Sequence, residues 1–276
     1  MQIKAFFELI RPLNCLMAAF GVFVGYFIAF SGAGIVFSET QLIIAMLAAF
    51  FVCAAGQTIN DVFDSEIDAR IRPKKPIPSK RITKDSAFWY SIGLFAIGNI
   101  LALFLMPASI VISISFTVLL IVYSAKMQKT KFLGNWIVGL GTAFTLVFGA
   151  TIIGNYNIVL FLAAAALLAN VAREIIKDTE DIDADKGLKV SLPMVAGKQF
   201  AKAFVFALYI VAIILPLFVF FALKFGNILF LVFAIVSAAI FLYSGKMFFD
   251  GKNDKAQLFS KIGMLIALIG FFAGAF

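Results

Sequence analysis

Residues 60–68 read NDVFDSEID, and this stretch follows directly on a long apolar run. Its aspartates, Asp61, Asp64 and Asp68, are spaced i, i+3 and i+7, so on a helix they lie on one face. The same spacing recurs 117 residues later, again after an apolar run, at Asp178, Asp181 and Asp185. Two acidic faces at the ends of apolar segments predict a site for divalent cations, because such ions prefer carboxylate oxygen ligands.

The composition predicts a membrane protein. Of the 276 residues, 63% are hydrophobic and only 14% are charged, and apolar runs recur from end to end. A transmembrane helix needs roughly 20 mostly apolar residues. We therefore expect an all-α integral membrane protein with about nine transmembrane helices, at 13–33, 41–60, 86–106, 108–125, 133–153, 157–176, 200–222, 227–245 and 256–275. We expect the first of these to be retained rather than cleaved as a signal peptide.

The distribution of basic residues predicts the orientation of the chain. With a cytoplasmic N-terminus, the inner segments and the adjoining helix ends hold every Lys and Arg except Lys224. We expect a cytoplasmic N-terminus, an outer C-terminus and an active site on the cytoplasmic side of the cell membrane. The basic residues behind the net charge of +8 then lie along one membrane face, where they could contact anionic headgroups. The charge does not indicate a nucleic-acid partner. The inner segments are 1–12, 61–85, 126–132, 177–199 and 246–255.

Some classes of site are excluded by what the chain lacks. It contains no histidine, which removes imidazole ligands and His-based acid–base chemistry. Cys15 and Cys53 form no metal or disulfide spacing, so we interpret them as small buried apolar residues. Residues 1–12 fit a short amphipathic helix on the inner membrane surface. The oligomeric state is not legible from the sequence.

The acids of the second span lie at a helix C-terminus, where the helix dipole disfavours them. They also repel one another, so the site needs cations nearby, either a metal or Lys and Arg side chains. The basic stretch 69–85 supplies such side chains, including Arg72 and Lys74. Three prolines within residues 73–78 predict that this loop is extended and stiff.

Polar residues also occur at the inner ends of two other spans. Asn14 stands at the start of the first span, either as a local cap or as a binding group. Asn170, Arg173 and Lys177 share one helical face with the second set of aspartates. Arg173 and Glu174 could instead pair with neighbouring residues.

The recurrence of the acidic end predicts an internal repeat. We expect a single domain over 1–276, with halves at roughly 1–130 and 131–276, and a site where the halves meet around a central cavity.

The two acidic patterns resemble those of a known family. The pattern Asn60-Asp61-x-x-Asp64-x-x-x-Asp68 followed by Arg72-Pro73, with the second acidic pattern after a sixth span, is similar to the UbiA-type intramembrane prenyltransferases. The resemblance covers essentially the whole chain. Residues 11–15 (RPLNC) and 72–79 (RPKKPIPS) look most like the archaeal branch, the digeranylgeranylglyceryl phosphate synthases. That branch joins geranylgeranyl diphosphate to geranylgeranylglyceryl phosphate in ether-lipid synthesis.

The resemblance implies a Mg²⁺-dependent enzyme, with two ions held between carboxylates and the diphosphate. The implied metal ligands are Asn60, Asp64, Asp68, Asp181 and Asp185. Asp61, Asp68 and Asp178 are implied in supporting or catalytic roles, with Asp68 or Asp178 as the proton acceptor. The implied substrate-binding residues are Arg72, Lys74 and Lys177 for the diphosphate, with Arg11, Asn14, Tyr123, Lys126, Lys129, Asn170 and Arg173 around them. One departure concerns Gln128, where relatives often carry a lysine; we expect Lys126 or Lys129 to take its role.

Alternative functions remain open at this stage. A cation transporter would also place acids in two repeats, but more typically near the middle of its spans. A CDP-alcohol phosphotransferase needs glycines among its aspartates, and residues 61–68 have none. A structural scaffold has no reason to place acids at unfavourable helix ends. Within prenyl transfer, the alternative acceptor is an aromatic quinone precursor or a tetrapyrrole.

Overall fold

The computed structural model describes residues 2–31, 33–34, 37–127, 130–182, 187 and 189–276. Within these ranges the regular structure is helical, and no strand is present apart from an isolated bridge between Thr130 and Val190. The helices in chain order are α1 (Gln2–Ile10), α2 (Pro12–Phe30), α3 (Glu39–Phe63), α4 (Ser65–Ile71), α5 (Lys84–Ala102), α6 (Pro107–Val122), η1 (Tyr123–Met127), α7 (Lys131–Ala150), α8 (Asn157–Glu180), α10 (Leu192–Val195), α11 (Lys198–Phe221), α12 (Ile228–Phe249) and α13 (Asn253–Ala273).

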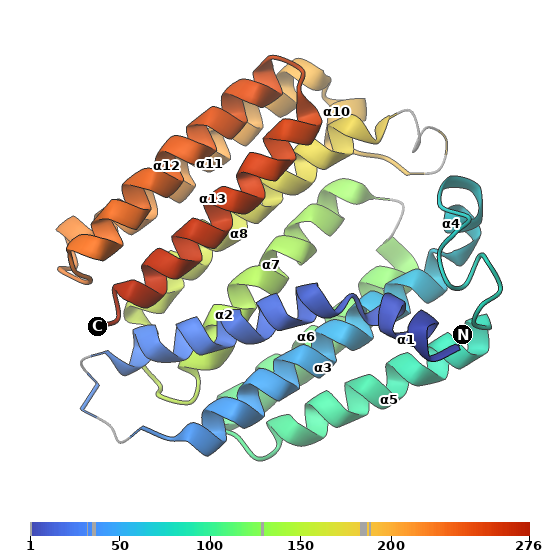
Figure 1. The fold of residues 1–276 in the computed structure, drawn as a ribbon, viewed down its shortest axis with the longest axis horizontal. Coiled ribbons are helices and arrows are strands. Elements are labelled where there is room, and N and C mark those ends of the chain that lie inside the picture. Colours follow the sequence, from blue (N-terminus) through green and yellow to red (C-terminus); the bar gives the residue numbers. More distant parts are fainter. Residues whose placement is uncertain (1, 32, 35–36, 128–129, 183–186, 188) are drawn as a thin grey trace. The chain divides into compact units, whose positions relative to one another are not determined.

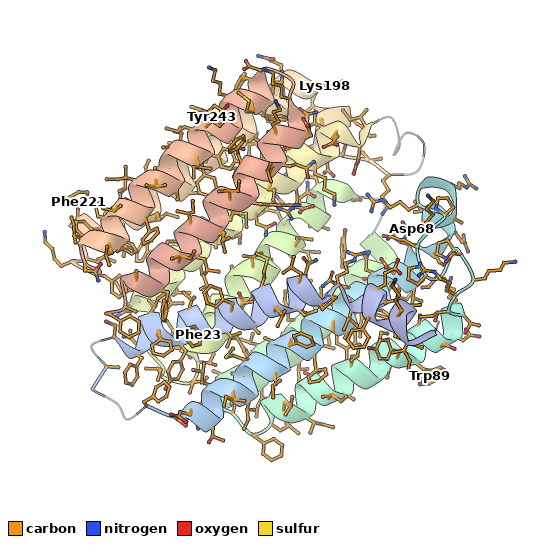
Figure 2. All side chains as sticks on the ribbon, in the orientation of Figure 1. Phe23, Asp68, Trp89, Lys198, Phe221 and Tyr243 are labelled. Atoms are coloured by element: carbon orange, nitrogen blue, oxygen red, sulfur yellow. The ribbon has the colours of Figure 1, made fainter. Side chains whose placement is uncertain are left out.

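All nine predicted spans are helices, and the all-α membrane fold is confirmed. Among the described residues, eight helices are long and apolar enough to cross a membrane. The exception is α5, whose Lys84, Asp85 and Asn99 lower its hydropathy. The predicted number of nine is therefore approximate. Large apolar side chains such as Trp89 and Phe221 lie on outer surfaces, 68% and 58% exposed, as expected of residues that face lipid (Figure 2).

The chain packs into two compact units, residues 1–23 with 37–128 and residues 24–36 with 129–276. The first unit is built around α3, which packs against α5, α6 and α1 (Figure 1). A β-carbon added at Gly98 of α5 would lie 2.7 Å from Val52 Cγ2, so glycine lets these two helices approach closely. Asn99 of α5 joins α6 by donating to Thr117 Oγ1 at 3.0 Å and accepting from Ser113 Oγ at 2.9 Å.

The second unit is a bundle in which α8 packs against α7, α11 and α13, and α12 packs against α11 and α13. Gly139 of α7 faces Val171 of α8, and an added β-carbon there would lie 2.8 Å from Val171 Cγ2. The buried hydroxyl groups of Tyr209 and Ser244 lie 3.1 Å apart, and Ser244 donates to the carbonyl of Ala256. This chain of hydrogen bonds satisfies polar groups that have no water partner inside the bundle.

Candidate active site

The first acidic end begins in α3 and continues into α4. Asp61 is the third residue from the C-terminus of α3, Asp64 is its C-cap, and Asp68 lies in α4. The helix is divided at Asp64, but its N–H still donates to Asn60 O and the N–H of Asp68 to Asp64 O, both at 2.8 Å. Helical spacing therefore persists, and all three aspartates are buried.

Two cationic side chains reach this end. Arg11 Nη2 donates to Asp61 Oδ1 at 2.7 Å. Lys75 Nζ donates to the same oxygen at 3.0 Å and to Asp68 Oδ2 at 2.6 Å. The expected need for nearby cations is met in this way by Arg11, from the turn between α1 and α2, and by Lys75, from the loop after α4.

The pKa of Asp68, whose side chain is labelled beside α4 in Figure 2, reflects these surroundings. Burial raises the pKa of Asp68 above its usual range, and the hydrogen bond from Lys75 opposes this rise. The neighbouring cation therefore favours the charged form of the Asp68 carboxyl group, which burial disfavours.

The loop that carries Lys75 is folded into turns, and the prediction that it is extended was wrong. Lys75 N donates to Arg72 O at 3.1 Å, which places Pro73 at the second position of a turn, where its fixed φ is favourable. Ser79 N donates to Lys75 O at 3.0 Å. The prolines block helix here, but their neighbours' carbonyl groups still accept hydrogen bonds.

The loop is also tied to α1. Arg81 donates through two nitrogens to the Glu8 carboxylate, at 2.6 and 3.0 Å, and through Nη2 to Lys74 O at 2.7 Å. The hydrogen bond from Arg81 holds the pKa of Glu8 below its ordinary value. In this way α1, the loop and the acidic end of α3 form one connected structure.

Gln57 lies one helical turn before Asp61 in α3, and its side chain is the hydrogen-bond partner of Asn14. Asn14 Nδ2 donates to Gln57 Oε1 at 3.0 Å. Gln57 Nε2 in turn approaches Ile10 O at 3.3 Å and the sulfurs of Cys15 and Cys53 at 3.7 and 3.5 Å. The two cysteines therefore lie around one amide, a proximity that their sequence spacing does not indicate.

The second acidic end lies at the C-terminus of α8. Asp178 is buried, at 3% exposure, and its Oδ2 accepts from Asn135 Nδ2 of α7 at 2.8 Å. Asp181 is the C-cap of α8, with its N–H donating to Lys177 O at 3.0 Å. Asp185 lies outside the described residues. Asn135 was not predicted, although a buried amide in an apolar span is the kind of signal that pointed to Asn170.

Arg173 and Lys177 of α8 both contact Glu174 of the same helix. Arg173 donates to Glu174, whose other oxygen lies 3.8 Å from Lys177 Nζ. Arg173 and Glu174 therefore pair with neighbouring residues, which was one of the two alternatives for them. Asn170 Nδ2 donates to Thr142 Oγ1 of α7 at 2.6 Å, while its buried Oδ1 has no hydrogen-bond partner among the described residues.

The other predicted site residues lie on loops and short elements. Tyr123 and Lys126 belong to η1, which packs against α3. Arg72 and Lys74 are exposed on the loop after α4. Lys129 and Gln128 lie outside the described residues. Within the first unit the structure thus brings Arg11, Asp61 and Asp68 together, and adds Lys75 to them.

The oxygen ligands of the first acidic end fit a hard divalent cation. Asn60 Nδ2 donates to Asp64 Oδ2 at 3.0 Å, so these two side chains are in contact. Across the described ranges, no three His, Cys, Asp or Glu side chains are arranged to hold a metal ion. Carboxylate and amide oxygens are the kind of ligand that Mg²⁺ prefers, and Mg²⁺ is commonly bound by one or two carboxylates together with waters and substrate phosphates.

Known proteins resemble this chain over most of its length. Residues 18–269 match the model of the UbiA prenyltransferase family. A digeranylgeranylglyceryl phosphate synthase of Pyrococcus horikoshii is 37% identical over 280 residues, covering 100% of this chain and 98% of that protein. A solved structure described as digeranylgeranylglyceryl phosphate synthase in membranes is 33% identical, with a TM-score of 0.83, and covers 99% of this chain and 98% of that chain.

A more distant solved structure shares the fold. It is a UbiA homolog from Archaeoglobus fulgidus bound to GPP and Mg²⁺, 19% identical with a TM-score of 0.70, covering 95% of this chain and 99% of that chain. The family match spans most of the chain, including both acidic helix ends. This chain therefore belongs to the UbiA prenyltransferase family.

Proposed function

We propose that this protein transfers a geranylgeranyl group from its diphosphate to geranylgeranylglyceryl phosphate, in the synthesis of archaeal ether lipids. The observation that carries this choice of substrates is the similarity over the full chain to a relative named digeranylgeranylglyceryl phosphate synthase. The buried aspartates at the ends of two membrane helices support a site for a charged diphosphate beside an apolar phase.

Residues of each acidic end are proposed as metal ligands. Asn60, Asp64 and Asp68 of the first end and Asp181 and Asp185 of the second would bind Mg²⁺, two ions in all. A UbiA homolog from A. fulgidus that shares this fold was solved with GPP and Mg²⁺, which supports the use of Mg²⁺. When bound, the ions would neutralise the charge that builds on the diphosphate as its bond to the prenyl carbon breaks.

The side chains of the chain itself would bind and orient the substrates. Arg72, Lys74 and Lys177 would contact the diphosphate, and these charge-assisted contacts strengthen as the leaving group gains charge. The acceptor hydroxyl oxygen forms the new bond to the prenyl carbon, and its proton passes to Asp68 or Asp178. Lys126, Lys129 or Arg11 would supply the charge that holds the phosphate of the acceptor. The other residues proposed to bind substrate are Asn14, Tyr123, Asn170 and Arg173.

The orientation of the protein follows from its charges. We place the N-terminus and the active site on the cytoplasmic side of the cell membrane and the C-terminus outside, because the Lys and Arg residues gather on one set of connections. The prenyl chains would then remain in the lipid phase while the diphosphate meets cytoplasmic Mg²⁺.

The test is an assay of the purified protein in detergent with labelled geranylgeranyl diphosphate, Mg²⁺ and alternative acceptors. We expect a labelled product with geranylgeranylglyceryl phosphate. Product with a 4-hydroxybenzoate-type acceptor and none with the glycerol-phosphate ether would overturn the choice of acceptor. Ion flux in liposomes without diphosphate turnover would instead identify a transporter.

The metal assignment has a matched control within the chain. Asp64, Asp181 and Asp250 are all C-cap aspartates of long helices. We expect Asp64→Ala and Asp181→Ala each to abolish product formation while the protein stays folded. Asp250→Ala, which lies outside the proposed site, should retain activity. Full activity of Asp64→Ala or Asp181→Ala would contradict the metal-ligand roles.

A further inference from the structure

One lysine side chain connects two acids of the first unit. Lys75 Nζ lies 3.0 Å from Asp61 Oδ1 and 2.6 Å from Asp68 Oδ2. The two carboxylates are nearly buried, with side chains 5% and 8% exposed, and the lysine side chain is 18% exposed. An ammonium group in this position offsets the repulsion between two carboxylates that have little contact with water.

We propose that Lys75 is an exchangeable counter-ion of the acidic end: its ammonium occupies the space between Asp61 and Asp68 in the metal-free protein and leaves when a divalent cation binds Asp68. This inference rests on the proposed function, because it takes Asp68 as a metal ligand. A Mg²⁺ ion bound through Oδ2 of Asp68, at about 2 Å, would lie within about 5 Å of the ammonium, and like charges at this distance repel strongly in a partly buried site.

The exchange needs movement of one side chain only, because the loop backbone is held on both sides of Lys75. Ser79 donates to Lys75 O through its N–H at 3.0 Å and through Oγ at 2.6 Å. Arg81 donates to Lys74 O at 2.7 Å and pairs with Glu8 of α1. The four-carbon stem of lysine rotates freely from such a fixed point, whereas the guanidinium of arginine is more rigid.

Arg11 explains why Asp61 tolerates the departure of Lys75. Its guanidinium lies 2.7 Å from Asp61 Oδ1, the same oxygen that Lys75 contacts. Asp61 therefore keeps a cationic partner in both states. Asp68 exchanges Lys75 for the divalent cation, so neither buried carboxylate is left with its charge uncompensated.

The exchange would link metal binding to the capture of an anion. While Lys75 bridges the carboxylates, its charge is directed at the protein. When the cation displaces it, the ammonium becomes available beside the site at which a diphosphate binds. Divalent cation would thus increase the affinity for diphosphate in two ways, through its own charge and through the released lysine.

The experiment uses purified full-length protein in detergent, without diphosphate or acceptor. The acylation rate of each lysine by an amine-reactive reagent is measured by peptide mass spectrometry with and without Mg²⁺. We expect Mg²⁺ to raise the acylation of Lys75 severalfold and to leave exposed Lys80, in the same loop, unchanged. Mn²⁺ binding, measured by electron paramagnetic resonance, should be at least about tenfold tighter in Lys75→Met than in wild type, and unchanged in Lys80→Met.

The outcomes separate this inference from the proposed function. Binding of Mn²⁺ with no Mg²⁺-dependent change at Lys75 would overturn the exchange and leave metal-dependent prenyl transfer intact. A rise in Lys75 acylation in a protein that transfers no prenyl group to any acceptor would support the exchange and contradict the proposed function. Should Lys75→Met fail to fold, the acylation of the wild-type protein still decides.

Discussion

The hydrogen bond between Asn135 and Asp178 gives a prediction whose size follows from the structure. The two side chains come from α7 and α8, are 5% and 3% exposed, and are joined at 2.8 Å. A hydrogen bond to a charged group contributes about 1.5–3 kcal/mol, and removing one partner of a buried pair leaves the other without water to replace it. We therefore expect Asn135→Leu to lower the free energy of unfolding by about 2 kcal/mol.

The measurement is the fraction of protein unfolded as sodium dodecyl sulfate is titrated into mixed micelles. A double-mutant cycle isolates the contact: Asn135→Ala, Asp178→Ala and the double variant are compared with wild type. The sum of the two single losses in unfolding free energy should exceed the loss in the double variant by about 1–3 kcal/mol, because the interaction can be lost only once. Losses that add within about 0.5 kcal/mol would show that Asn135 does not hold Asp178, and the reasoning would fail.

Two further predictions concern the first unit. Gly98→Ala should destabilise it by about 1–3 kcal/mol, since the added methyl group would lie 2.7 Å from Val52 Cγ2. Gly93→Ala is the control in the same helix: an added β-carbon there has nothing within 4 Å, so the change should be neutral or stabilising by up to about 1 kcal/mol. Equal effects of the two changes in the detergent titration would contradict the close approach of α3 and α5. Because the pKa of Glu8 is lowered in the folded protein by Arg81, the stabilisation from this pair is present above the ordinary pKa of a glutamate and is lost as the pH falls through the folded value. Proteolysis of α1 should therefore accelerate in acid in the wild type but not in Glu8→Gln, and an equal acceleration in both would exclude this pair as the cause.

The helices were legible from the sequence because each is a long apolar run. The expected span 41–60 corresponds to α3, Glu39–Phe63, and 157–176 corresponds to α8, Asn157–Glu180. Both helices continue past their apolar part into the acidic stretch, which hydropathy cannot reveal because the added turn is polar. This extension places Asp61 and Asp178 inside helices and makes Asp64 and Asp181 the caps.

The partners of the acids were less predictable, because they come from segments distant in the chain. Lys75 was one of seven basic residues in the stretch 69–85, and spacing gave no reason to prefer it. Its contacts depend on turns that the three prolines allow and that we expected them to prevent. The meeting of Cys15 and Cys53 at Gln57 has the same origin: it depends on the approach of Cys15 of α2 to Gln57 of α3, which residue spacing does not encode.

The two acidic ends have the same local structure, as the internal repeat predicts. Each has a buried aspartate inside the helix and an aspartate at the cap three residues later, whose N–H donates to the carbonyl four residues earlier, at 2.8 Å for Asp64 and 3.0 Å for Asp181. A helix C-terminus disfavours acids, so each buried carboxylate must be stabilised from elsewhere.

The described partners of the two buried aspartates include different side chains. Asp61 accepts from the charged side chains of Arg11 and Lys75, and Asp178 accepts from the amide of Asn135. The helix position recurs because it is set by local spacing, whereas each described partner depends on which neighbouring element reaches the helix end. A sequence motif can therefore locate the acids of such a site, whereas the groups that control their charge have to be found in the folded chain.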